Sequence, residues 1–161
     1  SNLVWADRGS IFTIQGISFA ALGGAISSDR ERREIHFPTE ATTQMDLDGL
    51  FYNTRYMDSI DVLLTHEAPM ECVIPGVVPL GGQLGADIAQ NRQYLSQAVQ
   101  RLSPKHLWHG HHHFGYRTMI DTRNGVTKVQ GYASNVEDDH SSYGFWDLGS
   151  LDNPYESVFG K

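Results

Sequence analysis

The stretch Asp61-Val62-Leu63-Leu64-Thr65-His66 decides the fold class of this chain. A short, continuous apolar run that ends in polar residues is typical of a strand buried on both faces, as in a parallel sheet. A second such run, His106-Leu107-Trp108-His109, follows a helical segment at Ala86–Leu102, which ends at Ser103-Pro104. This succession of strand, helix and strand predicts an α/β (α+β) fold, with a mixed sheet and flanking helices.

Two hairpins are expected on either side of this central unit. Gln15-Gly16 and Arg123-Asn124-Gly125 are the turn segments, because Gly and the Asn-Gly pair favour the tight turns that join antiparallel strands. The strands that they join are expected at Ile11–Ile14, Ile17–Leu22, Tyr116–Thr122 and Val126–Tyr132. A further helix is expected within Thr39–Asp58, and one more strand at Phe145–Leu148. No linker or repeat divides the sequence, so residues 1–161 are expected to form a single domain.

The composition excludes several classes of protein. The 161 residues are 40% hydrophobic and 19% charged, with 12 Lys and Arg against 19 Asp and Glu and a net charge of −7. This balance argues against a disordered tail and against general nucleic-acid binding, because an acidic chain has no broad attraction for phosphate backbones. Cys72 is the only cysteine, so a reducing compartment, the cytoplasm, is expected. No apolar stretch is long enough to span a bilayer, and no membrane partner is expected.

The histidines are the unusual feature, because four of the eight fall between His109 and His113. His66 stands at the C-terminal end of the first buried strand, where open α/β sheets place their ligands, and His111 and His113 follow the second. In extended backbone, residues i and i+2 face the same way, so both rings would face one cavity while His112 points away. Burying several imidazoles without partners is costly, which favours metal binding by His66, His111 and His113. The metal is expected to be Zn, Mn, Fe or Ni, because imidazole suits all four.

Other polar residues have weaker claims. His109 is expected to support the site rather than ligate the metal, because Gly110 interrupts the regular strand after it. Asp29, Arg30 and Arg33 follow a Gly-Gly turn and are candidates for contacting a substrate phosphate, since Arg suits bidentate phosphate contacts. The segment 67–85 is rich in Pro and Gly and is expected to form a long irregular loop.

Two motifs resemble those of the calcineurin-like metallophosphoesterases: Thr65-His66-Glu67-Ala68-Pro69, and much later Gly110-His111-His112-His113. The resemblance implies a four-layer αββα sandwich, of which this chain would be the C-terminal half. It also implies that His66 and His111 are ligands of one metal ion and that His113 is a ligand of a second. In this family a hydroxide shared by two ions attacks phosphorus in line, so the implied function is hydrolysis of phosphomonoesters or phosphodiesters.

The sequence departs from the family's pattern in its first half. Family members begin with Asp-x-His, followed by Gly-Asp-x-x-Asp and Gly-Asn-His, and no such succession precedes His66. The carboxylate that bridges the two ions in the family is therefore not identified, and no catalytic residue is assigned. The residues among which to search for that carboxylate are Asp7, Asp29, Glu67 and Asp139.

Two interpretations stay open. In the first, the chain is the C-terminal half of a metal-dependent phosphoesterase, which acts on a phosphorylated small molecule or a phosphodiester once it is joined to an N-terminal half. In the second, it is a non-catalytic, truncated or split module that binds metal weakly and serves in interaction or oligomerisation. One face of the sheet is expected to be unusually apolar, because the N-terminal half or a second copy would cover it. The isolated chain is expected to be inactive as an enzyme.

Overall fold

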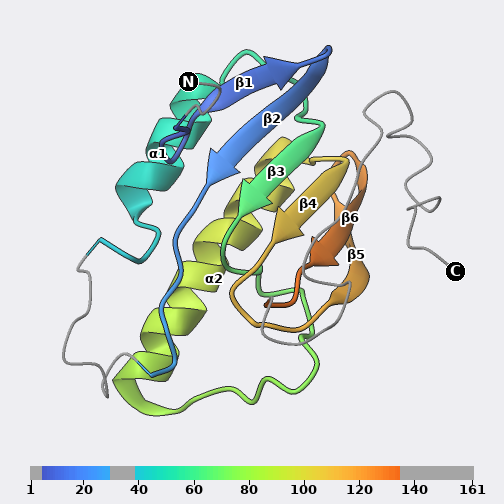
Figure 1. Ribbon diagram of the computed structural model, residues 1–161. Helices are drawn as coiled ribbons and strands as arrows, with labels where there is room; N and C mark the ends of the chain where they lie inside the picture. Colours follow the sequence, from blue (N-terminus) through green and yellow to red (C-terminus); the bar gives the residue numbers. More distant parts are fainter. Residues whose placement is uncertain (1–4, 30–38, 135–161) are drawn as a thin grey trace, which may run out of the picture.

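Six strands form one mixed sheet in the part of the chain that the computed structural model describes, residues 5–29 and 39–134. Their order across the sheet is β1-β2-β3-β4-β6-β5 (Figure 1). The strands are β1 (Ile11–Ile14), β2 (Ile17–Leu22), β3 (Val62–Thr65), β4 (His106–His109), β5 (Tyr116–Thr122) and β6 (Gly125–Gly131). The strand expected at Phe145–Leu148 lies outside the described residues.

The central strands run parallel, and each edge strand is antiparallel to its neighbour. β3 pairs in parallel with β2 on one side and with β4 on the other, and β4 pairs in parallel with β6. β1 and β5 complete the sheet as the outer arms of two hairpins. The sequence prediction of a mixed α/β arrangement, with parallel strands in the middle and a hairpin on either side, is confirmed.

The first helix, α1 (Gln44–Asn53), is shorter than the segment 39–58 in which it was expected. The hydroxyl of Thr43 accepts a hydrogen bond from the Asp46 amide, and the Asp46 carboxylate accepts one from the Thr43 amide. This reciprocal capping box fixes the start of the helix, because it satisfies backbone donors that a helix leaves free at its first turn.

The second helix, α2 (Gly82–Leu102), begins one turn earlier than the expected Ala86. Gly82 has a φ of +67°, a conformation that glycine adopts without strain. A Cβ atom at Gly85 would collide with the carbonyl oxygen of Leu80, so the chain turns into the helix through a space that a larger residue would fill. The glycines that suggest a loop from sequence are thus the residues that permit a tight entry into the helix.

Both described helices cover the same face of the sheet (Figure 1). Side chains from α1 and α2 pack there against alternate residues of the strands, because successive residues of a strand point to opposite faces. The buried members of this core include Ala20, Leu22, Leu47, Leu50, Leu63, Leu95, Val99, Leu102, Leu107 and Val129.

The opposite face carries a row of aromatic side chains from three strands. The rings of Phe12 and Phe19 stack with centroids 5.2 Å apart, and Trp108 meets Phe19 edge-on at 6.3 Å. Val62 and Leu64 pack into the same cluster. Neither α1 nor α2 lies on this face (Figure 1). We call Phe12, Phe19 and Trp108 the aromatic row.

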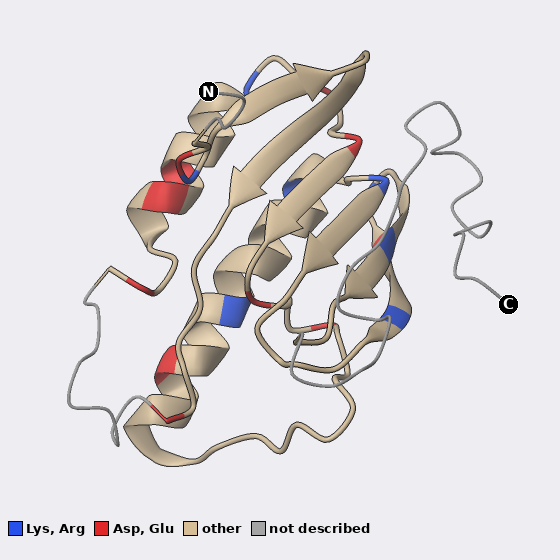
Figure 2. Cartoon of the chain, viewed as in Figure 1, with Lys and Arg blue, Asp and Glu red and all other residues tan. Residues whose placement is uncertain are grey.

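Charged side chains are interspersed over the described chain, and those on α1 are acidic only (Figure 2). Neither described helix combines the length and the apolar character that crossing a bilayer requires.

Candidate metal site

Parallel pairing brings the histidines of two distant segments together. β3 and β4 lie side by side with Leu64 level with Trp108, so their carboxyl ends finish at the same edge of the sheet. The residues that follow these ends are His66 and Gly110. A Cβ atom built on Gly110 would lie 3.6 Å from Nδ1 of His66, which places the His66 ring directly against the start of the next loop. Beyond it, the rings of His66 and His111 have centroids 5.1 Å apart.

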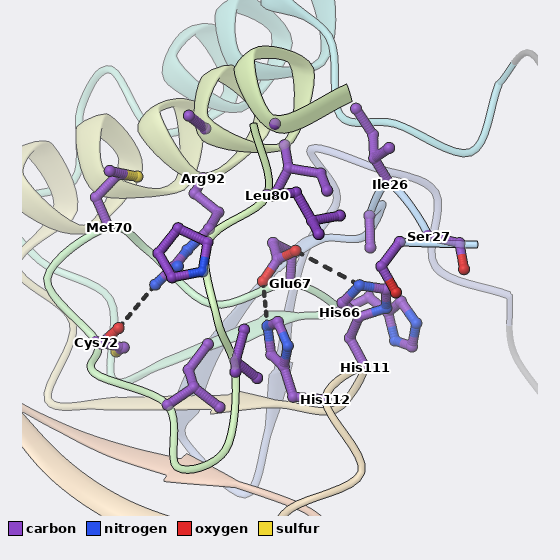
Figure 3. A pocket seen from close by; sticks show the side chains of 18 of the residues that line it. Ile26, Ser27, His66, Glu67, Met70, Cys72, Leu80, Arg92, His111 and His112 are labelled. Carbon is purple, nitrogen blue, oxygen red and sulfur yellow. Dashed lines mark hydrogen bonds and ion pairs between the residues drawn. The ribbon is translucent and has the colours of Figure 1, made fainter. Parts of the chain in front are cut away.

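Glu67 lies at the centre of this group, and its side chain is completely buried. Its Oε1 atom lies 2.5 Å from Nε2 of His112 and accepts a hydrogen bond of 2.7 Å from the amide of Ala68. Its Oε2 atom lies 3.6 Å from Nε2 of His111 (Figure 3). Burial by itself raises the pKa of Glu67, but the hydrogen bond and charge of His112, the Ala68 amide and His111 outweigh it, and the pKa is lowered. Glu67 is therefore an ionised carboxylate in the folded chain.

One carboxylate and two imidazoles are suitably placed to hold a metal ion. Glu67, His111 and His112 each offer one ligand atom, and these atoms all lie within 4.8 Å of one another. Oε2 of Glu67 is buried and has no hydrogen-bond partner. A buried oxygen of this kind is costly unless a cation or donor satisfies it, and mixed carboxylate and imidazole ligands suit several divalent transition metals.

The loop after β4 differs from the extended segment that the sequence suggested. His111 and His113 have φ values of +70° and +61°, so the backbone there is left-handed. The alternation of an extended strand does not apply, and the expectation that His112 points away from the site is wrong. Its ring lies 4.8 Å from that of His111, centroid to centroid, and contacts Glu67.

The other predicted ligands lie around the same cavity. His66 and His113 both line it, and both are more exposed than His111 and His112. The structure thus brings His66 and His111 together with Glu67 and His112, and it places His113 at the cavity wall outside the group that Glu67 organises.

Burial lowers the pKa of two imidazoles of this site, those of His111 and His66. Loss of solvent lowers the pKa of His111 to about 4, although the nearby Glu67 carboxylate acts in the opposite direction. The same cause lowers the pKa of His66. A neutral imidazole has a free nitrogen lone pair, which is the form that ligates metal ions.

His109 is held by two hydrogen bonds rather than being open to a ligand. Its Nδ1 lies 2.9 Å from the carbonyl of Gly110, which only accepts, so Nδ1 carries the proton. Its Nε2 then accepts from the hydroxyl of Tyr116 at 2.7 Å. Burial lowers the pKa of His109 to about 4, so the ring stays neutral. This arrangement anchors Gly110, the residue that leads into the histidine loop.

The thiol of Cys72 is also buried, and its pKa is raised to about 11 by burial. It is therefore protonated at neutral pH and is not an activated nucleophile.

A cavity of about 1070 Å³ adjoins the cluster, and the loop at residues 67–81 forms much of its wall. The long irregular segment expected at 67–85 is thus confirmed except for its last residues, which begin α2. Arg92 of α2 ties the loop down, because its guanidinium donates to the carbonyls of Ala68, Pro69 and Cys72 at 2.7–3.1 Å.

Of the three residues expected to contact a substrate phosphate, only Asp29 lies among the described residues. Asp29 lines the cavity, and its carboxylate accepts a hydrogen bond from the hydroxyl of Ser27. Arg30 and Arg33 lie outside the described residues. Of the carboxylates considered from sequence, Asp7 is exposed and bonds Trp5, and Asp139 lies outside the described residues, whereas Glu67 stands in the cluster.

Sequence reasoning missed His112 as a member of the site and named Glu67 only as one carboxylate among four. The available signal was position, because Glu67 directly follows a strand-end histidine and His112 lies between two others. The chain matches no protein-family model and no curated protein.

Proposed function

We propose that this chain is part of a metal-dependent phosphoesterase and that Glu67, His111 and His112 hold one divalent ion. The observation that carries the proposal is the buried, unpartnered Oε2 of Glu67, which lies 3.6 Å from Nε2 of His111. A cation bound beside these atoms would offset the carboxylate charge and provide the partner that Oε2 lacks.

The family resemblance extends the proposal to His66 and His113. It implies His66 and His111 as ligands of one ion and His113 as a ligand of another, and the Glu67 group shares His111 with that set. The short distance between the His66 and His111 rings, 5.1 Å, supports joint use of these two side chains. Both ligand sets contain His111. The set seen in the structure adds Glu67 and His112, whereas the set implied by the resemblance adds His66 and His113, so metal binding by variants of these four residues distinguishes the two sets.

The residues of the chain would provide the charge that binds the metal ion and the contacts that hold its ligands in position. A bound Zn, Mn, Fe or Ni ion would activate water and stabilise the charge that develops on the phosphoryl oxygens. Glu67 contributes a fixed negative charge, because its side chain is completely buried. His111 contributes a neutral ring, and His109 holds the backbone at Gly110 through its hydrogen bond. Ligands held by such supporting contacts keep their geometry when substrate enters.

We propose further that the sheet forms part of a four-layer αββα sandwich, with the aromatic row packed against a second sheet. That sheet would come from an N-terminal half or from a second copy of the chain. The support is the aromatic cluster itself, which lies on the face of the sheet opposite α1 and α2. The same feature favours the second candidate function, a non-catalytic module that binds metal and assembles with a partner.

The deciding experiment is a pair of titrations on the 161-residue chain, first with Mn²⁺ and then with inorganic phosphate at saturating Mn²⁺. Phosphate is expected to bind only when Mn²⁺ is present, because Glu67 is negative and the lowered pKa of His111, about 4, leaves that ring neutral. His111→Ala should remove Mn²⁺ binding, and His36→Ala, outside the histidine cluster of the sequence, should not. Mn²⁺ binding without any phosphate binding would favour the non-catalytic module, and absence of Mn²⁺ binding would contradict both.

A further inference from the structure

The cavity beside the metal cluster has one polar side and one apolar side. Glu67 and the histidines form the polar side, and Val73, Val77, Val78 and Leu80 from the 67–81 loop line the cavity as well. Figure 3 shows Leu80 and Ile26 around the same hollow as Glu67 and His66. Val73 and Val78 are 87% and 78% exposed, and Leu80 is 46% exposed. Several large apolar side chains exposed together beside a polar site are typical of a ligand-binding surface.

The loop that carries this apolar wall is held at two places. Arg92 fixes the start of the loop through three backbone carbonyls. Further along, a Cβ atom on Gly76 would lie 3.2 Å from the ring of Phe114, so the loop packs closely on the segment that follows the histidines. The wall thus lies close to the segment that follows the histidine loop, and both the wall and the cluster line the same cavity, so a ligand could contact both at once.

The two arginines among the described lining residues, Arg8 and Arg92, are already engaged. Arg8 donates to the carbonyls of Thr39, Glu40 and Ala41, and Arg92 donates to those of the loop. The carboxylates of Asp29 and Glu40 line the cavity too. Among the described lining residues, therefore, neither guanidinium is directed to a phosphate group, and this described part of the cavity favours a ligand with a single phosphate.

We infer that this cavity takes an ester of a single phosphate group whose organic part is apolar, with the phosphate at the metal cluster and the organic part against Val77, Val78 and Leu80. The inference rests on the proposed function, because the metal provides the charge that holds the phosphate. Burying about 60 Å² of apolar surface on this wall corresponds to roughly a tenfold gain in affinity.

The test compares phenylphosphonate with methylphosphonate, which present the same anionic group and differ in the apolar part. Binding to the Mn²⁺-saturated chain is measured by calorimetry. Phenylphosphonate is expected to bind about tenfold more tightly. Equal affinities would overturn the inference and leave the proposed function standing. If neither phosphonate binds, the proposed function fails, and the inference fails with it.

A variant pair locates the effect. Val77→Ser combined with Leu80→Ser should abolish the preference for phenylphosphonate and leave methylphosphonate affinity unchanged. Val126→Ser is the matched control, because Val126 is an exposed valine of β6 that does not line the cavity. A preference that survives the double substitution would place the apolar contact elsewhere and contradict the inference. The comparison of the two phosphonates on the unmodified chain needs no variant and decides the question even if the double variant does not fold.

Discussion

Nε2 of His112 lies 2.5 Å from Oε1 of Glu67, although the two residues are 45 positions apart in the sequence. The contact joins the end of β3 to the loop that follows β4, and it does so inside a buried cluster. The two oxygens of Glu67 therefore differ. Oε1 positions His112, whereas Oε2 has no hydrogen-bond partner and lies next to His111. A substitution of Glu67 should therefore disturb the positions of both His111 and His112.

Glu67→Gln should weaken Mn²⁺ binding by at least about tenfold, because an amide keeps the shape of the side chain but removes its charge. Calorimetric titration measures the loss. Glu71→Gln is the matched control, since Glu71 is exposed and bonds Ser96 outside the cluster. Equal affinities for the two variants would show that Glu67 neither ligates nor orients the metal ligands.

Stability should depend on pH through His109. Burial lowers the pKa of this residue to about 4 in the folded chain, whereas an unfolded histidine has a pKa near 6.5. Between these values the unfolded state binds the proton and the folded state does not, so the free energy of unfolding falls as pH decreases from 6.5 to 4. One such group contributes a slope of up to about 1.4 kcal/mol per pH unit.

His109→Gln removes this titration while keeping a donor and an acceptor, so the variant should lose less stability than the parent chain over that interval. Urea unfolding at several pH values measures the difference. His113→Gln, at an exposed position, is the matched comparison, and His109→Gln should change the pH dependence more than His113→Gln does. Parallel curves for His109→Gln and the parent would show that His109 does not stay neutral in the fold.

The sheet could be predicted from sequence because each strand carries a local signal. The apolar run at Val62–Thr65 and the turn at Asn124-Gly125 are both recognised from residues that are adjacent in the sequence. The convergence of His66 and His111 followed from one further rule, that parallel strands end at the same edge.

The interior of the site could not be predicted in the same way. The left-handed backbone at His111 and His113 is uncommon for residues other than glycine, so an extended loop was the natural expectation. The partner of His112 lies on a different strand, and no local pattern pairs it with Glu67. The hold of Arg92 on the 67–81 loop likewise depends on tertiary packing, since its three acceptors are backbone carbonyls that any sequence would offer.

Arg92→Met should loosen the 67–81 loop and lower the free energy of unfolding by about 2–4 kcal/mol, because three backbone carbonyls lose a charged donor. Hydrogen exchange should show faster exchange in that loop than in the core strands. Arg101→Met is the matched control on the same helix, where the guanidinium lies 5.2 Å from the Phe51 ring. A loop that exchanges no faster in Arg92→Met would mean that other contacts hold it.

In the proposed sandwich with a second copy of the chain, the aromatic row packs between the two copies, so the chain should associate with itself. Light scattering is expected to give a mass above that of one chain, and Trp108→Ala should shift it toward the monomer. Trp5→Ala is the control, because Trp5 is 87% exposed and does not belong to the row. A monomer at high concentration, with no binding of an apolar dye, would contradict the proposed sandwich.

The cluster should bind one metal ion per chain rather than two. Two divalent ions about 4 Å apart repel each other by roughly 16 kcal/mol at an effective dielectric constant of 20. The group formed by Glu67, His111 and His112 contains a single carboxylate to offset that repulsion. Elemental analysis after dialysis against Mn²⁺ should give one ion per chain, and hydrolysis of an activated phosphodiester should be correspondingly low. Two tightly held ions, both lost in Glu67→Gln, would instead identify Glu67 as a bridging carboxylate and show that the described residues already form a dinuclear site.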